Sequence, residues 1–294
     1  MMRLIKRRFV FCFLATFLLA HFALAQDRTF VVLASGDIAK CDSDGISVGA
    51  EMTARLLDHY EGIILALGDL AYLEGTHEQF RNCYDPTWGR HKQRTRPVPG
   101  NHDYRTYGAA GYFAYWAERA GPEGQGYYSF SLGSWQIIAL NSNLEKEARF
   151  EQLDWLRAEL TGTDARCILA FWHHPIFSSL ERGASRNMRP PFKALYEAGA
   201  SVVLAGHDHV YERFAPQDPR SRLDPWNGIR AFTVGTGGAP FYRFATIHPN
   251  SAFRYNRSWG VLRLVLRPTS YEWEFLTVNG QHLDKGRSDC VDRH

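Results

Sequence analysis

The residues of this sequence that could do chemistry stand in short polar clusters, each directly after an apolar run. Their side chains are carboxylates, a carboxamide and imidazoles, which bind metal ions or carry protons. They are Asp37, Asp69, Asn101 with His102, His173 with His174, and His207 with His209. A single Asp after a strand is usually a turn or helix cap. Five such clusters in one chain are not explained by capping, and together they predict a metal site.

Four of the apolar runs that lead into these clusters are typical of buried β-strands. The runs cover residues 30–35, 63–67, 167–172 and 201–205. Functional groups of parallel α/β sheets gather at the carboxyl ends of the strands. We therefore expect the polar clusters to meet at one edge of a sheet.

Apolar residues at helical spacing predict two helices between these strands. The first set lies between the first two strands and consists of Val48, Met52, Leu56 and Tyr60. The second set precedes the third strand and consists of Phe150, Leu153, Leu156 and Leu160. Strand and helix alternate, which indicates a βαβ organisation.

Other segments have a different character. Residues 127–141 are typical of a hairpin that turns at Gly133-Ser134, and residues 271–275 alternate aromatic side chains with glutamates as a one-sided antiparallel strand does. The sheets are therefore expected to be mixed. Residues 73–100 show little periodicity, and we expect an irregular loop there that walls the active site.

Five short motifs resemble those of the calcineurin-like metallophosphoesterases and, within that superfamily, the purple acid phosphatases. The family motifs are GDxG, GDxxY, GNH(D/E), VxxH and GHxH. This chain has, in the same order, Gly36-Asp37-Ile38-Ala39, Gly68-Asp69-Leu70-Ala71-Tyr72, Gly100-Asn101-His102-Asp103, Ala170-Phe171-Trp172-His173 and Gly206-His207-Asp208-His209. Ala39 and Ala170 depart from the patterns, but neither position supplies a side-chain ligand. The segments 211–213 and 235–238 also resemble the family and are expected to be structural.

The resemblance implies a binuclear metal centre. The first metal would take Asp37, Asp69, Tyr72 and His209, and the second would take Asp69, Asn101, His173 and His207. Asp69 would bridge the two ions. Two carboxylates and a phenolate favour iron(III), whereas the mostly neutral second set suits a divalent ion such as Fe, Zn or Mn. Iron(III) and a divalent ion together carry about +5, and the three anionic ligands carry −3. The centre would therefore keep a surplus of about +2, which suits a phosphate dianion.

Two ligand positions need a further argument. Tyr72 separates the purple acid phosphatases from relatives that use two divalent ions, because tyrosinate bound to iron(III) gives the family its colour. The family spacing of His, one residue and then Pro selects His173 as the ligand. It leaves His174 as a supporting hydrogen-bond donor or a catalytic contact of the substrate.

The resemblance also implies the reaction. Two metals about 3.5–4 Å apart polarise phosphoryl oxygens and generate a metal-bound hydroxide for in-line attack, so no protein nucleophile is required. His102 follows a ligand Asn and is expected to protonate the leaving oxygen as a general acid. The alternative role for His102 is simple phosphate binding.

The function expected from this site is hydrolysis of phosphate monoesters, as in an acid phosphatase. A phosphodiesterase or nucleotide pyrophosphatase would use the same metals with a different pocket. Some relatives keep the fold as an interaction scaffold, but those have generally lost metal ligands. This chain retains all of them, and such ligand sets imply a bound metal.

The first 25 residues are typical of an export signal, with a basic start, an apolar run and small residues before a cleavage point after Ala25. An uncleaved anchor is the alternative, but the apolar run is shorter than the ~20 residues that span a membrane. We expect a periplasmic or extracellular protein. Without the signal, the chain contains 30 basic and 31 acidic residues. This balance favours small phosphorylated substrates over nucleic acid or a membrane surface.

Four cysteines remain after the signal, which contains Cys12. An even number in an exported chain is compatible with disulfides, and four cysteines allow three pairings. Cys41 and Cys83 each follow a strand end that bears a metal ligand, so we expect them to pair. Cys167 and Cys290 would then pair or stay free.

The expected fold class is α/β, with a two-sheet mixed β-sandwich flanked by helices in the βαβαβ arrangement of the metallophosphoesterases. Residues 26–294 are long enough for a large core, and no linker, repeat or low-complexity tract divides them. We expect a single catalytic domain.

Overall fold

The computed structural model describes residues 28–41, 45, 47–181 and 184–292. The predicted export signal, residues 1–25, lies outside the described residues. Among the helices that the structure describes, none has the length and apolar character needed to cross a membrane.

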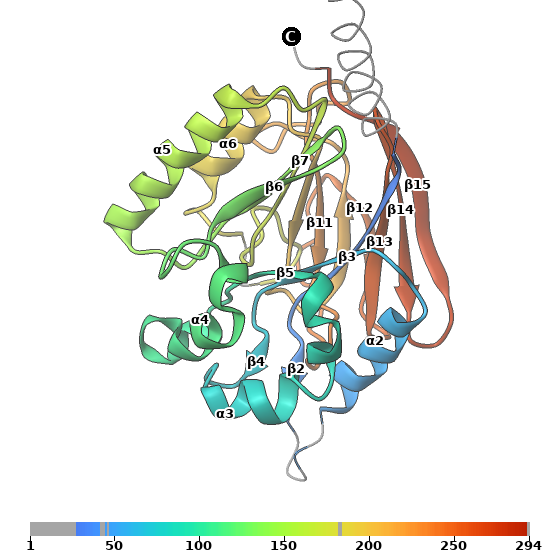
Figure 1. Cartoon of the computed structure of the whole chain (residues 1–294). Helices are drawn as coiled ribbons and strands as arrows, with labels where there is room; N and C mark the ends of the chain where they lie inside the picture. The colour runs from blue at the N-terminus through green and yellow to red at the C-terminus, as the bar shows by residue number, and fades with distance from the viewer. Residues whose placement is uncertain (1–27, 42–44, 46, 182–183, 293–294) are drawn as a thin grey trace, which may run out of the picture.

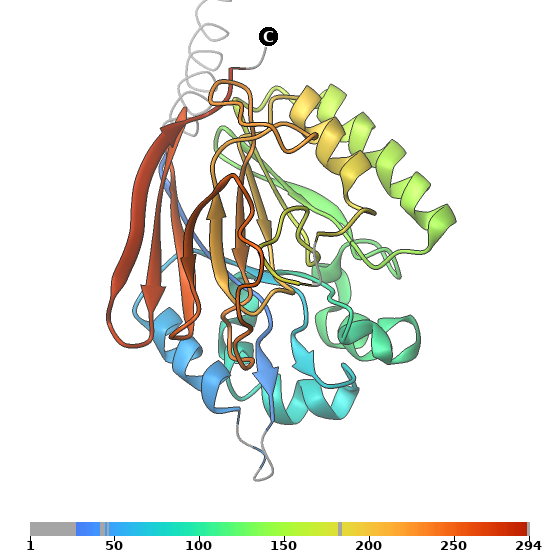
Figure 2. The same cartoon turned by 180° about the vertical axis from the view of Figure 1, so that it is seen from behind.

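Two β-sheets lie face to face (Figures 1 and 2). The first has the order β15 (His282–Asp289), β14 (Ser270–Thr277), β13 (Gly260–Leu266), β1 (Phe30–Ser35), β3 (Ile63–Leu67) and β5 (Thr95–Val98). In this sheet β1, β3 and β5 are parallel, and β13 joins β1 antiparallel. The two predicted strands at 30–35 and 63–67 are confirmed.

The second sheet has the order β12 (Ser251–Tyr255), β10 (Tyr211–Phe214), β11 (Arg230–Val234), β9 (Val202–Ala205), β8 (Cys167–Phe171), β7 (Trp135–Ala139) and β6 (Tyr128–Leu132). Its central strands β7, β8, β9 and β11 are parallel. The predicted hairpin is confirmed, because Leu132 pairs with Trp135 across the turn at Gly133-Ser134.

Alternate residues of both sheets make the central core. Val32, Ala34 and Leu65 from the first sheet and Leu169 and Phe171 from the second are all fully buried in one cluster. The alternation arises because successive side chains of a strand point to opposite faces. The predicted mixed sandwich is therefore confirmed, and its interior fixes how the two sheets sit against each other.

Helices cover the outer faces of both sheets (Figure 1). The second sheet packs against α5 (Lys146–Gly162) and α6 (Arg189–Glu197) through a separate cluster that includes Leu153, Leu156 and Leu160. Those three residues are buried as predicted. Phe150, the fourth member of the predicted stripe, is 59% exposed, so the helix is confirmed but this part of its buried face is corrected.

Helix α2 (Val48–Asp58) covers the first sheet. Of the face predicted for it, Leu56 and Tyr60 pack against the core as expected, but the other half is wrong. Val48 and Met52 are 48% and 36% exposed. The buried side is instead made of small residues, Gly49, Ala50, Thr53 and Ala54, together with Leu57. The small residues are needed because the backbone of the loop at Gly238 lies against Gly49. Backbone proximity, rather than apolar bulk, therefore selects the buried face.

The expectation of an irregular loop over residues 73–100 is also wrong. The segment forms α3 (His77–Gln79), η1 (Phe80–Tyr84), η2 (Trp88–Arg94) and β5, and beyond it lie η3 (Asp103–Arg105), η4 (Tyr107–Ala109), α4 (Ala110–Trp116) and η5 (Ala117–Ala120). Phe80, Tyr84 and Trp88 are buried against α2 and α4. The segment therefore contributes to the core, because its large aromatic side chains bury more area than those of a surface loop would.

A small parallel sheet and two disulfides fix the loops. Strands β2 (Ala39–Lys40) and β4 (Ala71–Tyr72) pair after β1 and β3. The predicted disulfide between Cys41 and Cys83 is present, and so is the pair of Cys167 and Cys290, with Cα separations of 5.4 and 5.7 Å. The first ties η1 to the loop that follows Asp37.

The packing of α2 generates a test of the corrected face. In Gly49→Ala, the new Cβ would lie 2.3 Å from the carbonyl oxygen of Gly238. Although Ala gains up to ~1 kcal/mol of helix propensity, we expect the overpacking to lower the free energy of unfolding by about 1–3 kcal/mol. Met52→Ala, on the exposed face, should change it by less than about 0.5 kcal/mol. Denaturant titration of both variants measures this, and a Gly49→Ala protein more stable than wild type would contradict the packing.

Candidate metal centre

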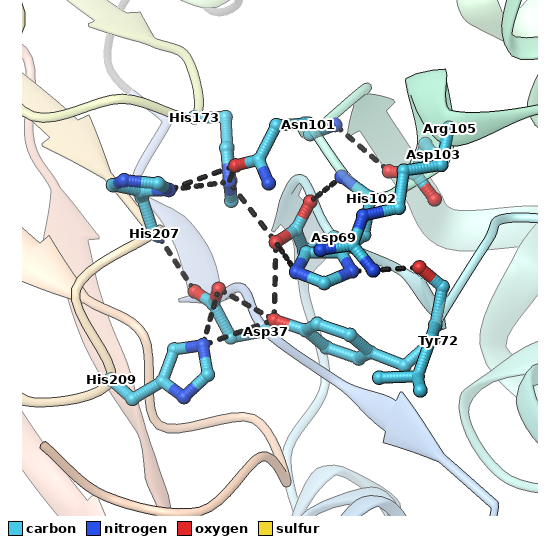
Figure 3. Close-up of polar contacts among 12 residues, drawn as sticks. Asp37, Asp69, Tyr72, Asn101, His102, Asp103, Arg105, His173, His207 and His209 are labelled. Atoms are coloured by element: carbon cyan, nitrogen blue, oxygen red, sulfur yellow. Dashed lines mark hydrogen bonds and ion pairs between the residues drawn. The ribbon is translucent and has the colours of Figure 1, made fainter.

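The predicted clusters meet at the carboxyl ends of five parallel strands. Asp37 follows β1, Asp69 follows β3 and Asn101 follows β5, while His173 follows β8 and His207 follows β9. The first three come from one sheet and the last two from the other. Figure 3 shows their side chains pointing toward a common centre at the edge where the sheets meet.

Sharp turns of the backbone aim three of these side chains inward. Asp37, Asp69 and His207 have φ angles of 60°, 52° and 70°. Non-glycine residues rarely adopt this left-handed region, and Asp, Asn and His tolerate it best. Strain of this kind persists where the surroundings enforce it, typically at functional sites. Each of the three residues follows a Gly directly at the end of a strand.

The first donor set surrounds the phenol of Tyr72. Its oxygen lies 2.9 Å from Asp37 Oδ1, 3.2 Å from Asp69 Oδ2 and 3.1 Å from His209 Nε2. His209 Nε2 lies 3.3 Å from Asp37 Oδ1. Four donor atoms from four elements therefore face one another at nearly equal distances.

The second donor set surrounds the carboxamide of Asn101. Its Oδ1 lies 2.9 Å from His207 Nδ1 and 3.1 Å from His173 Nε2, and these two nitrogens are 3.3 Å apart. His173 Nε2 lies 3.4 Å from Asp69 Oδ2. The same carboxylate oxygen of Asp69 thus belongs to both sets.

These spacings fit two metal ions. Metal–ligand bonds of about 2.1 Å at right angles separate neighbouring donors by about 3.0 Å. The imidazoles are also oriented as ligands, since His173 Nδ1 donates to the Leu67 carbonyl and His209 Nδ1 to the Pro240 carbonyl, both within 2.8 Å. In the neutral imidazoles these bonds fix the tautomer and leave Nε2 with its lone pair toward the centre, as metal binding requires. The ligand assignment itself stays a prediction.

The backbone approaches Asp69 so closely that one position excludes a side chain. A Cβ on Gly100 would lie 2.1 Å from both the amide nitrogen and Oδ1 of Asp69. The backbone N–H of His102 donates to the same Oδ1 at 2.7 Å. Gly100 therefore lets the loop after β5 close on the carboxylate, so that Asn101 reaches the second donor set.

Burial and charge set the protonation of the ligands. Although burial opposes both shifts, the charges of Asp69 and His173 hold the pKa of Asp69 well below its usual range and raise the pKa of His173 to about 9. Burial, followed by the charge of His173, lowers the pKa of His174 and of His207 to about 3. Burial and the carboxylates of Asp37 and Asp69 raise the pKa of Tyr72 well above its usual value. A phenolate here therefore requires a cation in contact with it.

The two predicted catalytic histidines lie on different sides of the centre. His102 Nδ1 donates to the Leu73 carbonyl at 2.7 Å, and its Nε2 lies 3.9 Å from Asp69 Oδ2. His174 Nδ1 faces the Ser142 hydroxyl at 2.8 Å, and one of its ring nitrogens comes within 4.8 Å of a ring nitrogen of His173 and of His207. His173, not His174, is the residue that faces Asn101 and Asp69.

Sequence reasoning missed three partners of the centre. Asp103 is fully buried and accepts the N–H groups of Gly100 and Leu70 at 2.8 and 3.2 Å. Burial and the charge of Asp69 raise its pKa. Its place in the third motif could have indicated this, and Ser142 also follows a strand end. The Leu73 carbonyl carries no side-chain signal at all.

Comparison with known proteins identifies relatives of this site. A model of the calcineurin-like phosphoesterase family matches residues 18–211, about two thirds of the chain. Purple acid phosphatase 15 of Arabidopsis thaliana is 27% identical over 241 residues, covering 69% of this chain and 45% of that protein. Purple acid phosphatase 21 of the same plant is 29% identical over 211 residues, covering 64% and 47%. The chain thus spans about half the length of the curated relatives it matches.

Solved structures share the fold. Purple acid phosphatase PPD1 from yellow lupin seeds superposes with a TM-score of 0.73 at 18% identity, over 91% of this chain and 55% of that one. GAP50, described as the anchor in the inner membrane complex of Plasmodium, gives 0.70 at 16% identity over 90% of both chains. These likenesses establish the architecture alone.

The shared oxygen of Asp69 generates a test of the two donor sets. Asp69→Asn removes charge from both sets, so we expect loss of both metals and a fall in activity beyond the ~10- to 100-fold typical of outer partners. Asp37→Asn, the matched control, should spare the ion held by Asn101, His173 and His207. Metal analysis of both variants measures this. Equal metal loss in the two, or full retention in Asp69→Asn, would contradict the sharing.

Proposed function

The chain belongs to the calcineurin-like phosphoesterase family, and from this premise we propose that it hydrolyses phosphate monoesters with a binuclear metal centre, in the manner of the purple acid phosphatases. One observation carries the proposal. Two sets of mutually facing donors share a single carboxylate oxygen, Asp69 Oδ2. A shared donor of this kind can bind two adjacent cations. Paired metals are suited to in-line displacement at phosphorus.

One ion would be held by Asp37, Asp69, Tyr72 and His209. The other would be held by Asp69 together with Asn101, His173 and His207. When bound, the metals would supply Lewis acidity to phosphoryl oxygens and lower the pKa of water. Tyr72 favours iron(III) in the first position, because a phenolate is a hard anionic donor. Metal analysis of the purified protein, with its visible absorption, identifies the ions.

His102 is the residue of this chain that we assign to proton transfer. Because its Nδ1–H is committed to the Leu73 carbonyl, its Nε2 is the nitrogen that can carry a proton toward the substrate. The ring packs on Tyr72 with centroids 4.5 Å apart, which fixes its orientation. A positioned imidazole of this kind can protonate a leaving alkoxide.

Export to the periplasm or medium, action on small phosphorylated substrates and a single catalytic domain over 26–294 are parts of the same proposal. The composition of residues 1–25 supports export, and so do two disulfides, which persist in oxidising compartments.

The ratio of activity on p-nitrophenyl phosphate to activity on its bis ester tests the proposed specificity. We expect the monoester to be hydrolysed faster, since a dianion makes fuller use of the surplus positive charge at the centre. Faster cleavage of the diester would favour a phosphodiesterase or nucleotide pyrophosphatase of the same superfamily. Bound metal without activity on either ester would favour a scaffold.

The assignment of His102 predicts a dependence on the leaving group. In His102→Ala, alkyl phosphates such as glycerol phosphate should lose roughly 100-fold or more in kcat/KM, the size of effect typical of general acids. Phenolic esters should lose little, because their oxygens leave without protonation. Kinetics across leaving groups of graded pKa, with metal content measured in parallel, tests this. Equal losses across the series would mean that His102 binds phosphate, and loss of metal would mean that it supports the ligands.

A further inference from the structure

A cavity of about 280 Å³ includes in its wall Ser142, which contacts His174 beside the metal centre. It lies among the strand end after β7, the first turn of α5 and residues 186–191. Three cations line it, Lys146, Arg149 and Arg186, and no carboxylate is among its lining residues. Phe150, 59% exposed, lines it too.

These three cations have no side-chain partner in the part of the chain that the structure describes. None of them takes part in the ion pairs or side-chain hydrogen bonds found there. Another basic cavity, beside α6, is different, since Lys193 pairs with Glu197 and Arg222 with Asp218. An uncompensated group of like charges that faces one cavity raises the local concentration of anions.

Two of these cations occupy positions where they do not stabilise their own helix. Lys146 and Arg149 stand in the first turn of α5, a helix of 17 residues. The helix dipole disfavours positive side chains at this end by roughly 0.3–1 kcal/mol each. Helix stability therefore gives no reason for them, whereas an anion in the cavity would.

The cavity and the metal centre share a wall. Ser142 lines the cavity, and its hydroxyl lies 2.8 Å from His174 Nδ1. The ring of His174 is centred 4.5 Å from the ring of His207, one of the predicted ligands. Asn141, also in the lining, donates to the Tyr104 hydroxyl at 2.8 Å, on the loop that carries His102. His174 thus contacts both the cavity wall, through Ser142, and a predicted metal ligand, His207.

We propose that this cavity binds a second anionic group of the substrate, so that the preferred substrates are phosphomonoesters whose alcohol part carries a further phosphate or carboxylate. The inference rests on the proposed phosphatase function. The volume is below the ~300–1,000 Å³ of sites for whole drug-sized ligands, which suits one part of a substrate. The exposed ring of Phe150 offers an apolar surface for the carbon skeleton between the two anions.

The experiment compares bisphosphates of straight-chain α,ω-diols, three to six carbons long, with their monophosphates. We expect the wild type to prefer at least one bisphosphate by about 10-fold or more in kcat/KM beyond the statistical factor, the effect of a hydrogen bond to a charged group. Arg149→Gln and Arg186→Gln should each reduce this preference. Arg157→Gln, on the same helix but paired with Asp154 outside the cavity, is the matched control and should leave it unchanged.

Two further measurements separate the possible failures. The wild-type preference should fall with added salt, because screening weakens attraction between exposed charges, and this needs no variant. Affinities for alkylene bisphosphonates relative to alkyl phosphonates report the cavity without turnover. No activity on p-nitrophenyl phosphate, with a bisphosphonate preference that Arg149→Gln reduces, would overturn the phosphatase function and keep the anion site. Activity with no bisphosphate preference, or with one that neither salt nor the variants alter, would overturn the anion site alone.

Discussion

The buried carboxylate of Asp69 is the constraint on which the rest of this structure depends. Its side chain is 2% exposed, and a buried charge is costly unless charge and hydrogen bonds compensate it. One oxygen accepts the N–H of His102, and the other faces Tyr72 and His173. Compensation therefore has to come from several elements at once. That requirement explains why the position two residues after β5 must be a glycine, Gly100, which lets the loop reach the carboxylate.

The sandwich supplies what a single sheet could not. Asp37, Asp69 and Asn101 extend from the first sheet, whereas His173 and His207 extend from the second. The donor atoms face one another at 2.9–3.4 Å. A shift of one sheet by about an ångström would therefore change the spacing of the donors in both sets. The close-packed core between the sheets resists such a shift. The apolar packing between the sheets thus holds the candidate metal-binding groups at the polar edge in their relative positions.

Much of the fold and of the site could be predicted because the signals are local. A strand that ends in Gly-Asp or Gly-His shows its buried run and its polar end in adjacent residues. The face of α2 could not be predicted this way, because contact with the backbone at Gly238 outweighs the apolar bulk of Val48 and Met52. The prediction for residues 73–100 was wrong for a similar reason. Their short helices are stabilised by tertiary packing, and such helices are too short to show a clear apolar periodicity in the sequence. The carbonyl of Leu73 has no signature in the sequence.

Fold and function separate at the level of side chains. A structure described as an anchor superposes on this chain about as well as a purple acid phosphatase does, so the sandwich alone selects neither role. The donor residues favour chemistry at phosphorus, and they lie on strand ends where the core fixes them. The cations of the adjoining cavity lie instead at the start of α5 and beside α6, where loops can vary without disturbing the centre. If the cavity binds a second anionic group as proposed, reaction type and substrate preference are encoded in different parts of the molecule. On that proposal, the preference can change through a few charged residues while the rigid donor sets stay as they are.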